Sequence, residues 1–258
     1  MRYPFSFVEN LIVKNETLCS WKIIWRKYVT IIIVILLSHG ANQTEGIAML
    51  VTLDAKELLA AARLAYDKDQ IRSWAKCLLI KVRYDKYTIV GSDGYKLIEF
   101  EHKVNHDAAD VSEKHNADFL LDIEDVKKYV KSTDSCVIID YDGDADNLTA
   151  HIYQQKKSDD WLRNVVEFDN LSKFGWEYID YKHIIETQRD NDGTIHQGYA
   201  AWVNADYMSD ICAAVKLAYG KGTPVQIMIG LEGRAMEFVT SDYKNERSCF
   251  GMVMPVRR

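Results

Sequence analysis

The sequence predicts an α+β protein built from repeated β-α-β-β-β units. Apolar runs of strand length alternate with amphipathic segments of helical spacing. Asp-Gly and similar turn signals separate consecutive strands. The same order of elements returns roughly every 60–70 residues from Met49 onward, a period too long for a typical solenoid. Because the connections are short, we expect antiparallel sheets with the helices on one face.

The first unit begins with a predicted strand, "MLVTLD" (49–54), and a predicted helix over 55–69. Asp54 is suited to cap this helix because its carboxylate can accept a backbone hydrogen bond from the first turn. The stretch from 76 to 104 divides into three strands at Asp-Lys and Ser-Asp-Gly turns. Apolar side chains at helical spacing support the helix: Leu58, Leu59, Ala62, Ala65 and Tyr66.

The second and third units repeat this order. A strand ending at 122 precedes a predicted helix over about 123–131, and further strands follow up to 157. In the third unit a strand leads into a predicted helix over about 205–219, and three strands complete the chain. Between the two units, the aromatic-rich stretch 159–193 is predicted to be a packed connector.

Composition sets broad limits on function. The chain has 258 residues, of which 27% are charged and 48% hydrophobic, as in an ordinary globular protein of one or two domains. The net charge of -6 argues against a simple basic nucleic-acid binder. It is compatible with a local basic face on an acidic body.

The five cysteines are scattered and show no CxxC spacing. Four of them lie inside apolar runs, which predicts buried free thiols in a reducing compartment. Disulfides or metal ligands are the alternative. The cysteines are Cys19, Cys77, Cys136, Cys212 and Cys249.

Residues 1–48 do not fit the repeat. The apolar run "YVTIIIVILL" is about ten residues long, too short for the ~20 that a membrane-spanning helix needs. It suits the apolar core of a signal peptide, but Glu9 and Glu16 in the preceding region are unusual there. A third interpretation is that translation starts at Met49, since codons for Glu45-Gly46 can form a ribosome-binding sequence. The nucleotide sequence would test it.

Three segments in this order resemble the bacterial sliding clamp, the beta subunit of DNA polymerase III. They are "VGSDGYKL" (90–97), "YIDYKHII" (178–185) and the terminal "VMPVRR" (253–258). The family carries related motifs in its middle domain, at a domain junction and at its C-terminus. The resemblance covers residues 49–258.

The resemblance implies a non-catalytic replication factor. Clamps form a homo-oligomeric ring around duplex DNA, bind it without sequence preference and tether the polymerase in the cytoplasm. Helices line the hole and sheets form the outer wall. Short peptide motifs of polymerases and the clamp loader bind a hydrophobic pocket. The resemblance implies no cofactor and no small-molecule substrate.

The peptide pocket is implied to have two walls, the middle-domain turn and the C-terminal tail. A methionine-rich tail can adapt to varied apolar anchors, and Pro255 stops further strand pairing. A plain core strand is the alternative interpretation of this tail. The implied pocket residues are Ser92, Gly94, Tyr95, Lys96, Leu97, Met252, Met254, Pro255 and Val256.

Basic residues on and beside the predicted helices are candidates for phosphate contact, which is electrostatic and independent of base sequence. Solvated helix faces often carry the same residues, and nearby acidic side chains weaken the positive field. The candidates are Lys56, Arg63, Arg72, Lys76, Lys127, Lys128, Lys131 and Lys216.

The chain departs from the family in its number of units. The bacterial family has six units in three domains, whereas three are predicted here. We expect an atypical segment over 1–48, a clamp-like domain of two units over 49–186, and a clamp-like half-domain over 187–258. This organisation suits a reduced clamp of phage or prophage type. The alternatives are a non-ring relative that competes for clamp-binding motifs, and an exported or membrane-tethered α+β binding protein.

No metal site is predicted. The "DYDGDAD" stretch (140–146) resembles the start of a calcium loop, but the twelfth position is His151 rather than the required Glu. The histidines show no HExxH or HxH spacing. An acidic hairpin turn is the favoured interpretation of 140–146.

Overall fold

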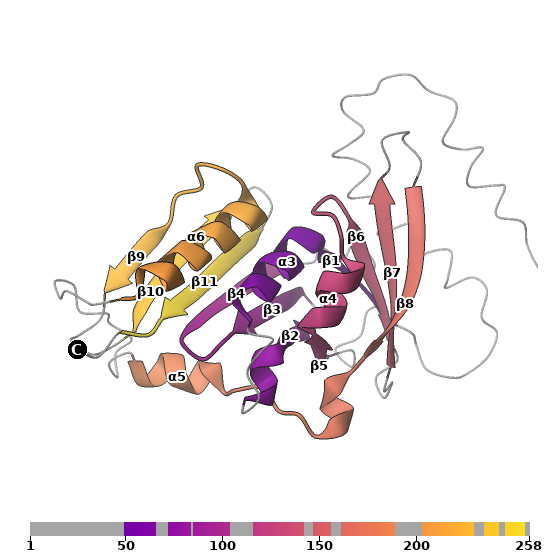
Figure 1. Ribbon diagram of the computed structural model, residues 1–258, viewed down its shortest axis with the longest axis horizontal. Helices are drawn as coiled ribbons and strands as arrows, with labels where there is room; N and C mark the ends of the chain where they lie inside the picture. Colours follow the sequence, from indigo (N-terminus) through magenta and orange to yellow (C-terminus); the bar gives the residue numbers. More distant parts are fainter. Residues whose placement is uncertain are drawn as a thin grey trace, which may run out of the picture. The chain divides into compact units, whose positions relative to one another are not determined.

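In the computed structural model, two complete β-α-β-β-β units are followed by the helix and three strands of a third (Figure 1). This confirms the predicted α+β class with antiparallel sheets. The described residues are 49–65, 72–83, 85–103, 116–141, 147–155, 161–188, 203–229, 235–242 and 246–255. Residues 1–48, the strand expected before the third helix, most of the 140–146 turn and Val256 lie outside these ranges.

The elements of the three units correspond in order. The first unit contains β1 (Met49–Asp54), α3 (Ala55–Leu64), the 3-10 turn η1 (Ser73–Lys76), β2 (Cys77–Val82), β3 (Lys86–Ser92) and β4 (Lys96–Lys103). The second contains β5 (Ala117–Asp122), α4 (Ile123–Tyr129), β6 (Cys136–Tyr141), β7 (Asn147–Gln155) and β8 (Trp161–Asp169). The third contains α6 (Ala205–Tyr219), β9 (Gln226–Ile229), β10 (Met236–Asp242) and β11 (Arg247–Val253).

Each unit starts its helix with the same local device. The side chains of Asp54, Asp122 and Asn204 each accept a hydrogen bond from the backbone N–H two residues further on, at 2.7–2.8 Å. An Asx side chain at this position satisfies one of the free amides of the first helical turn. The three helices therefore begin in the same local way.

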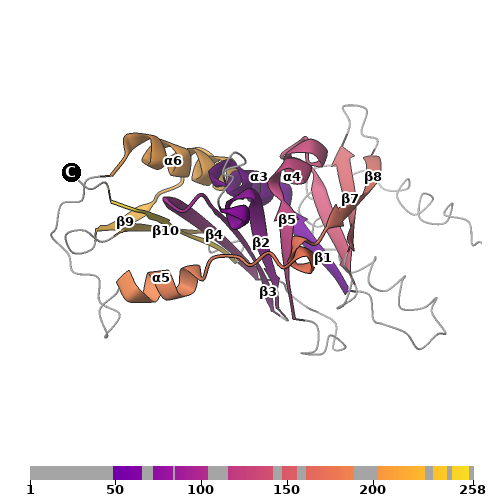
Figure 2. The same ribbon diagram turned by 60° about the horizontal axis from the view of Figure 1, so that its bottom comes forward.

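The strands form two antiparallel sheets. A four-stranded sheet has the order β1-β6-β7-β8, and a seven-stranded sheet has the order β5-β2-β3-β4-β11-β10-β9. Helices α3, α4 and α6 lie on one face of the seven-stranded sheet (Figure 1). The connector, with η3 (Leu171–Phe174) and α5 (Tyr181–Gln188), lies on the other face (Figure 2).

Two apolar clusters follow from this layering. The larger lies between the helices and the facing sides of both sheets and includes Leu58, Ile80 and Phe100. The helices approach the sheet closely, and a Cβ at Gly91 would overlap the backbone carbonyl of Ala61. The smaller cluster lies on the opposite face of the seven-stranded sheet, under the connector.

The structure corrects three details of the prediction. Helix α3 ends at Leu64 rather than at residue 69. The first part of the expected connector is β8, the last strand of the second unit. Ala60, which is not among the apolar residues that support the predicted helix, is fully buried because α3 packs against both α4 and α6.

Cysteine burial is only partly as predicted. Cys77 and Cys249 are buried and unpaired, whereas Cys136 is half-buried and Cys212 is exposed on α6. Burial raises the pKa of the Cys77 thiol to about 12, so it stays protonated. In the described part of the chain, no three potential metal-ligating side chains lie together.

The third unit joins the first through β4 and β11, which pair from His102 opposite Arg247 to Lys96 opposite Val253. At the Arg247 end, the guanidinium contacts the Glu57 carboxylate at 2.5 and 2.7 Å and Asp54 at 3.3 Å. Tyr87 donates a hydrogen bond to the same glutamate at 3.1 Å.

Burial governs the titration of this cluster. Burial raises the pKa of Glu57 to about 7, although the charge of Arg247 opposes the rise. Burial, together with the charge of Arg247, lowers the pKa of the neighbouring His102 to about 4. His102 is therefore neutral at physiological pH, and the cluster depends on the arginine–carboxylate contacts.

Candidate partner-binding site

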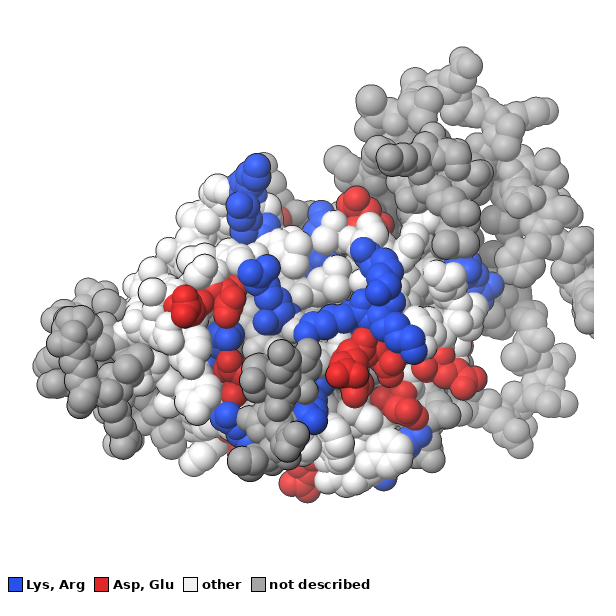
Figure 3. Space-filling view, in the orientation of Figure 1, with Lys and Arg blue, Asp and Glu red and all other residues white. Residues whose placement is uncertain are grey.

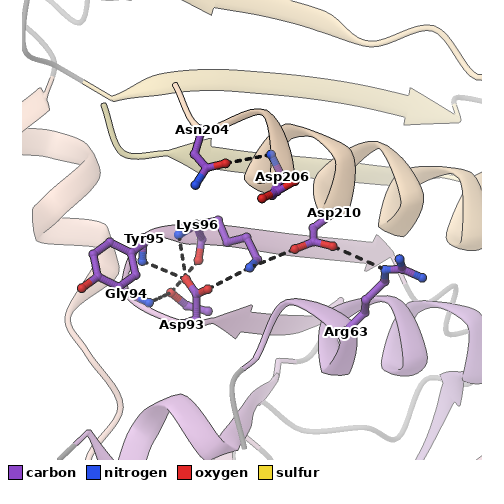
Figure 4. A network of polar contacts seen from close by, with 9 residues as sticks. Arg63, Asp93, Gly94, Tyr95, Lys96, Asn204, Asp206 and Asp210 are labelled. Atoms are coloured by element: carbon purple, nitrogen blue, oxygen red, sulfur yellow. Dashed lines mark hydrogen bonds and ion pairs between the residues drawn. The ribbon is translucent and has the colours of Figure 1, made fainter. Parts of the chain in front are cut away.

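The β3–β4 turn is held in one conformation by its own side chains. Asp93 accepts hydrogen bonds from the backbone amides of Tyr95 and Lys96 at 2.8 and 2.9 Å (Figure 4). Ser92 accepts one from the amide of Gly94 and donates one to the carbonyl of Lys96. Gly94 has φ +88°, a value that residues with a Cβ rarely adopt. The Ser-Asp-Gly sequence therefore produces the tight turn locally.

The C-terminal tail is bonded directly to this turn. The backbone N–H of Met254 donates to the carbonyl of Tyr95 at 2.8 Å, one residue beyond the end of β11. Further along the pair, Leu97 of β4 lies opposite Met252 of β11, and both side chains are buried. Two segments separated by more than 150 residues in sequence thus meet at one place. The predicted turn and tail lie side by side.

Side chains of this region divide into a buried and an open set. Leu97 and Met252 belong to the smaller apolar cluster, against which Met254 packs while partly exposed. Tyr95 is 49% exposed. Its ring stacks on Tyr207 at 5.9 Å, and the Arg72 guanidinium lies 5.1 Å from its centre. Tyr95 of the turn and Met254 of the tail are therefore both partly accessible to solvent, and their backbones are hydrogen-bonded to each other.

Lys96 was predicted to line the peptide pocket, but its side chain points inward toward α6. Its ammonium contacts Asp93 at 2.8 Å and Asp210 of α6 at 3.1 Å, and its side chain is almost fully buried (Figure 4). Asp210 also lies 4.0 Å from Arg63 of α3. These contacts raise the pKa of Lys96 even though burial alone would lower it. Lys96 therefore links the turn to α6 and α3.

The connector contributes residues that sequence reasoning did not assign to the site. Tyr181 and Ile185 of α5 are buried in the same cluster as Leu97 and Met252. Tyr178 and Ile184 pack against it, and the Tyr178 hydroxyl donates to the carbonyl of Val90 at 3.4 Å. The signal was present in the aromatic and apolar spacing of "YIDYKHII", but periodicity alone does not reveal which sheet face a connector covers.

A groove of about 390 Å³ opens beside this cluster, between the connector and strands β2 and β5. Apolar side chains and a few charged ones line it, including Leu79, Leu120, Trp176, Ile179, Tyr181 and Lys182. None of the nine predicted pocket residues lines it. The groove therefore lies on the same face of the sheet as Leu97 and Met252, but over β2 and β5 rather than at the turn and tail.

Most of the basic candidates lie on or beside the helices. Arg63 of α3, Lys127 and Lys128 of α4, Lys131 after it and Lys216 of α6 are exposed, and Lys56 is half-exposed. Lys and Arg side chains gather over the middle of the helical face, with acidic side chains beside them (Figure 3). The helical face therefore has a central group of basic side chains with acidic side chains around it.

Two basic candidates lie at the 3-10 turn η1. Arg72 directly precedes it, and Lys76 is its last residue. The Arg72 guanidinium lies within 5.9 Å of the Trp74 ring as well as over Tyr95. Arg72 therefore belongs to the surface formed by the turn.

Comparison with known proteins identifies the architecture. The sequence matches no protein-family model and no curated protein. Among solved structures, it is similar to the DNA polymerase III beta subunit of Thermotoga maritima, with a TM-score of 0.51 and 13% identity over 85% of this chain and 69% of that one. The chain has the fold of a bacterial sliding clamp.

A second clamp structure gives the same result. The DNA polymerase III subunit beta from Pseudomonas aeruginosa matches with a TM-score of 0.51 and 11% identity, over 86% of this chain and 70% of that one. At such low identity the likeness establishes the fold alone. In the described part of the chain, no helix is both long and apolar enough to cross a membrane.

Proposed function

We propose that this protein is a reduced sliding clamp of phage or prophage type. It would act in the cytoplasm as a non-catalytic processivity factor that encircles duplex DNA and binds peptide motifs of a polymerase and a clamp loader. The fold supports this proposal, and the hydrogen bond from Met254 to Tyr95 carries it furthest. That bond holds the turn and the tail together, which supports the proposal that they form one peptide-binding surface.

Peptide binding at this surface has a simple physical basis. Tyr95 is exposed and Met254 is partly exposed, and a groove elsewhere on the connector side of the sheet is lined by Trp176 and Ile179. Aromatic and methionine side chains adapt to apolar anchors of varied shape. We propose Ser92, Gly94, Leu97, Met252, Pro255 and Val256 as the supporting wall, with Lys96 holding the turn in place from behind.

The experiment is fluorescence anisotropy with a labelled peptide of the Gln-Leu-x-Leu-Phe type. We expect micromolar binding to the full chain and at least about tenfold weaker binding after deletion of residues 254–258. The deletion starts after β11, so the strand pair is retained. Val165→Ala on the distant β8 serves as the matched control and should bind normally. Equal binding by the deletion variant would refute the pocket.

Sequence-independent DNA binding is the second part of the proposal. Replacing Lys127, Lys128 and Lys131 with Gln should weaken binding of duplex DNA and make it less salt-dependent. The logarithmic slope should fall by about one unit for each phosphate that a lysine no longer neutralises. Lys182→Gln, on the opposite face of the sheet, is the control. An unchanged salt dependence would remove these lysines from the DNA-binding face.

A non-ring relative that occupies clamp-binding motifs is the alternative function. It shares the peptide surface but needs neither DNA binding nor self-association. A monomeric protein that binds the peptide and not DNA would favour this alternative.

A further inference from the structure

The first two turns of α6 contact the β3–β4 turn through two side chains. Tyr207 and Asp210 are three residues apart, so they lie on the same side of the helix. The Tyr207 ring stacks on Tyr95 with 5.9 Å between the ring centres, and its centre lies 4.9 Å from the Lys96 ammonium. Asp210 contacts the same ammonium at 3.1 Å (Figure 4). Sequence reasoning assigned neither of these α6 residues to the site.

Lys96 carries the contact with Asp210 into the turn. Its ammonium also contacts one oxygen of Asp93 at 2.8 Å, and its side chain is only 9% exposed. The other oxygen of Asp93 accepts the hydrogen bonds from the backbone amides of Tyr95 and Lys96. The Asp210 carboxylate is therefore only two ionic contacts away from the atoms that fix the backbone of the turn.

Asp210 has a second cationic neighbour, on the helical face. One of its oxygens contacts Lys96, and the other lies 4.0 Å from the Arg63 guanidinium of α3 (Figure 4). The Arg63 side chain is 54% exposed, and that of Asp210 is 35% exposed. Ion pairs at such sites are weak, because water and dissolved ions compete for both charges. Arg63 can therefore leave Asp210 for another anion, whereas the buried Lys96 cannot.

We propose that Asp210 couples the helical face to the β3–β4 turn. When an anion such as a DNA phosphate draws Arg63 away, the Asp210 carboxylate acts on Lys96 alone and holds the turn more firmly. A turn held in one conformation binds a peptide more tightly, because less freedom is lost on binding. The effect on peptide affinity rests on the proposed function, whereas the coupling of Arg63 to the turn does not.

The test is a double-mutant cycle, measured by anisotropy of the labelled peptide. Arg63→Gln should tighten binding about twofold, because it mimics an arginine drawn away. Asp210→Asn should weaken binding about threefold, because the buried Lys96 loses the Asp210 charge. In the double variant, the loss of Arg63 should have no further effect. Arg163→Gln, at an exposed arginine of β8, is the matched control and should leave peptide binding unchanged.

Duplex DNA serves as the anion probe in the same assay. It should tighten peptide binding to the unmodified chain about twofold, as Arg63→Gln does, and should have no such effect on Arg63→Gln itself. By linkage, the peptide should tighten DNA binding by the same factor. Equal effects of the duplex on both proteins would overturn the role of Arg63.

Hydrogen exchange of the backbone amides in residues 92–97 monitors the turn without any peptide. Followed by mass spectrometry, exchange should be faster in Asp210→Asn, slower in Arg63→Gln, and equal in Asp210→Asn and the double variant. General destabilisation cannot produce opposite changes in the two single variants. Unchanged exchange in Asp210→Asn, or an effect of Arg63→Gln that survives in the double variant, would overturn the coupling. The expected exchange pattern without peptide binding would contradict the proposed function alone.

Discussion

The two ends of the β4–β11 strand pair join the third unit to the first with different chemistry. At one end, Arg247 and Glu57 form an almost completely buried ion pair beneath α3. At the other end, Lys96 is buried but its partner Asp210 is one-third exposed, and the nearby Tyr95 is half exposed. The Arg247 end is therefore shielded from solvent, whereas the Tyr95 end is partly exposed to it.

This difference in solvent exposure predicts that the two ends contribute differently to stability and to partner binding. A buried ion pair is costly to disturb, because removing one partner leaves the other charged and desolvated. A half-exposed network tolerates change, because water replaces a missing partner. We therefore expect stability to depend most on the Arg247 end and partner binding to depend most on the Tyr95 end. Three predictions test the expected difference in stability between the two ends, from the largest expected effect to the smallest.

Arg247→Met should reduce the free energy of unfolding by about 3–5 kcal/mol at pH 8, because it leaves buried carboxylates without their partner. At pH 5 the loss should be smaller, since Glu57, with its pKa raised to about 7, can protonate. Urea denaturation at the two pH values measures both quantities.

Arg83→Met is the control for this measurement. Arg83 pairs with Asp118 at a solvent-exposed site, so the loss should stay below about 1 kcal/mol. Similar losses for both variants would contradict the contrast between a closed and an open end.

Glu57→Gln should change how stability depends on pH. Burial raises the folded pKa of Glu57 from 4.5 to about 7, so ionisation opposes folding. Its stabilising contribution is complete below about pH 4.5 and is lost as pH rises through about 7, amounting to about 3 kcal/mol. The unmodified protein should thus lose about this much relative to Glu57→Gln between pH 4.5 and 8.

His102 titrates with the opposite sign in both proteins. Its folded pKa is lowered to about 4, so its contribution is lost as pH falls from about 6.5. Because His102 is present in both, its effect largely cancels in the difference. A pH-independent difference in unfolding free energy would show that Arg247 keeps Glu57 ionised throughout.

Lys96→Met should cost about 1–2 kcal/mol, less than Arg247→Met. Asp93 would keep its hydrogen bonds from the amides of Tyr95 and Lys96, and Asp210 would gain water. Urea denaturation again provides the measurement, with Lys86→Met at the partly exposed Lys86–Glu101 pair as control. If Lys96→Met lowered the free energy of unfolding as much as Arg247→Met, the two ends would contribute equally to stability, contrary to this prediction.

Local features of the molecule were predictable because their physics is local. The caps at Asp54, Asp122 and Asn204 involve residues two positions apart, so turn and helix starts follow from neighbouring side chains. Helix α6 begins and ends as predicted, at Ala205 and Tyr219. The Ser-Asp-Gly turn and the three strands around it also follow from short-range signals.

Features that depend on packing between units were predicted less well. Ala60 and Cys212 lie in similar sequence surroundings, yet Ala60 is buried between helices and Cys212 is exposed. The candidate site shows the same limit. The turn and tail were expected to meet, but the connector side chains on their sheet face and the inward orientation of Lys96 depend on neighbours distant in sequence.

The sequence by itself determined the α+β class, the repeat, the cap at Asp54 and the residue types available to a peptide site. Only the tertiary structure decided which strands exchange between units, that β4 pairs with β11, and that Glu57 and Arg247 meet in a buried pair. The physical reason is range. Hydrogen-bonded turns and caps are settled within a few residues, whereas burial and ion pairing depend on which distant surfaces pack together.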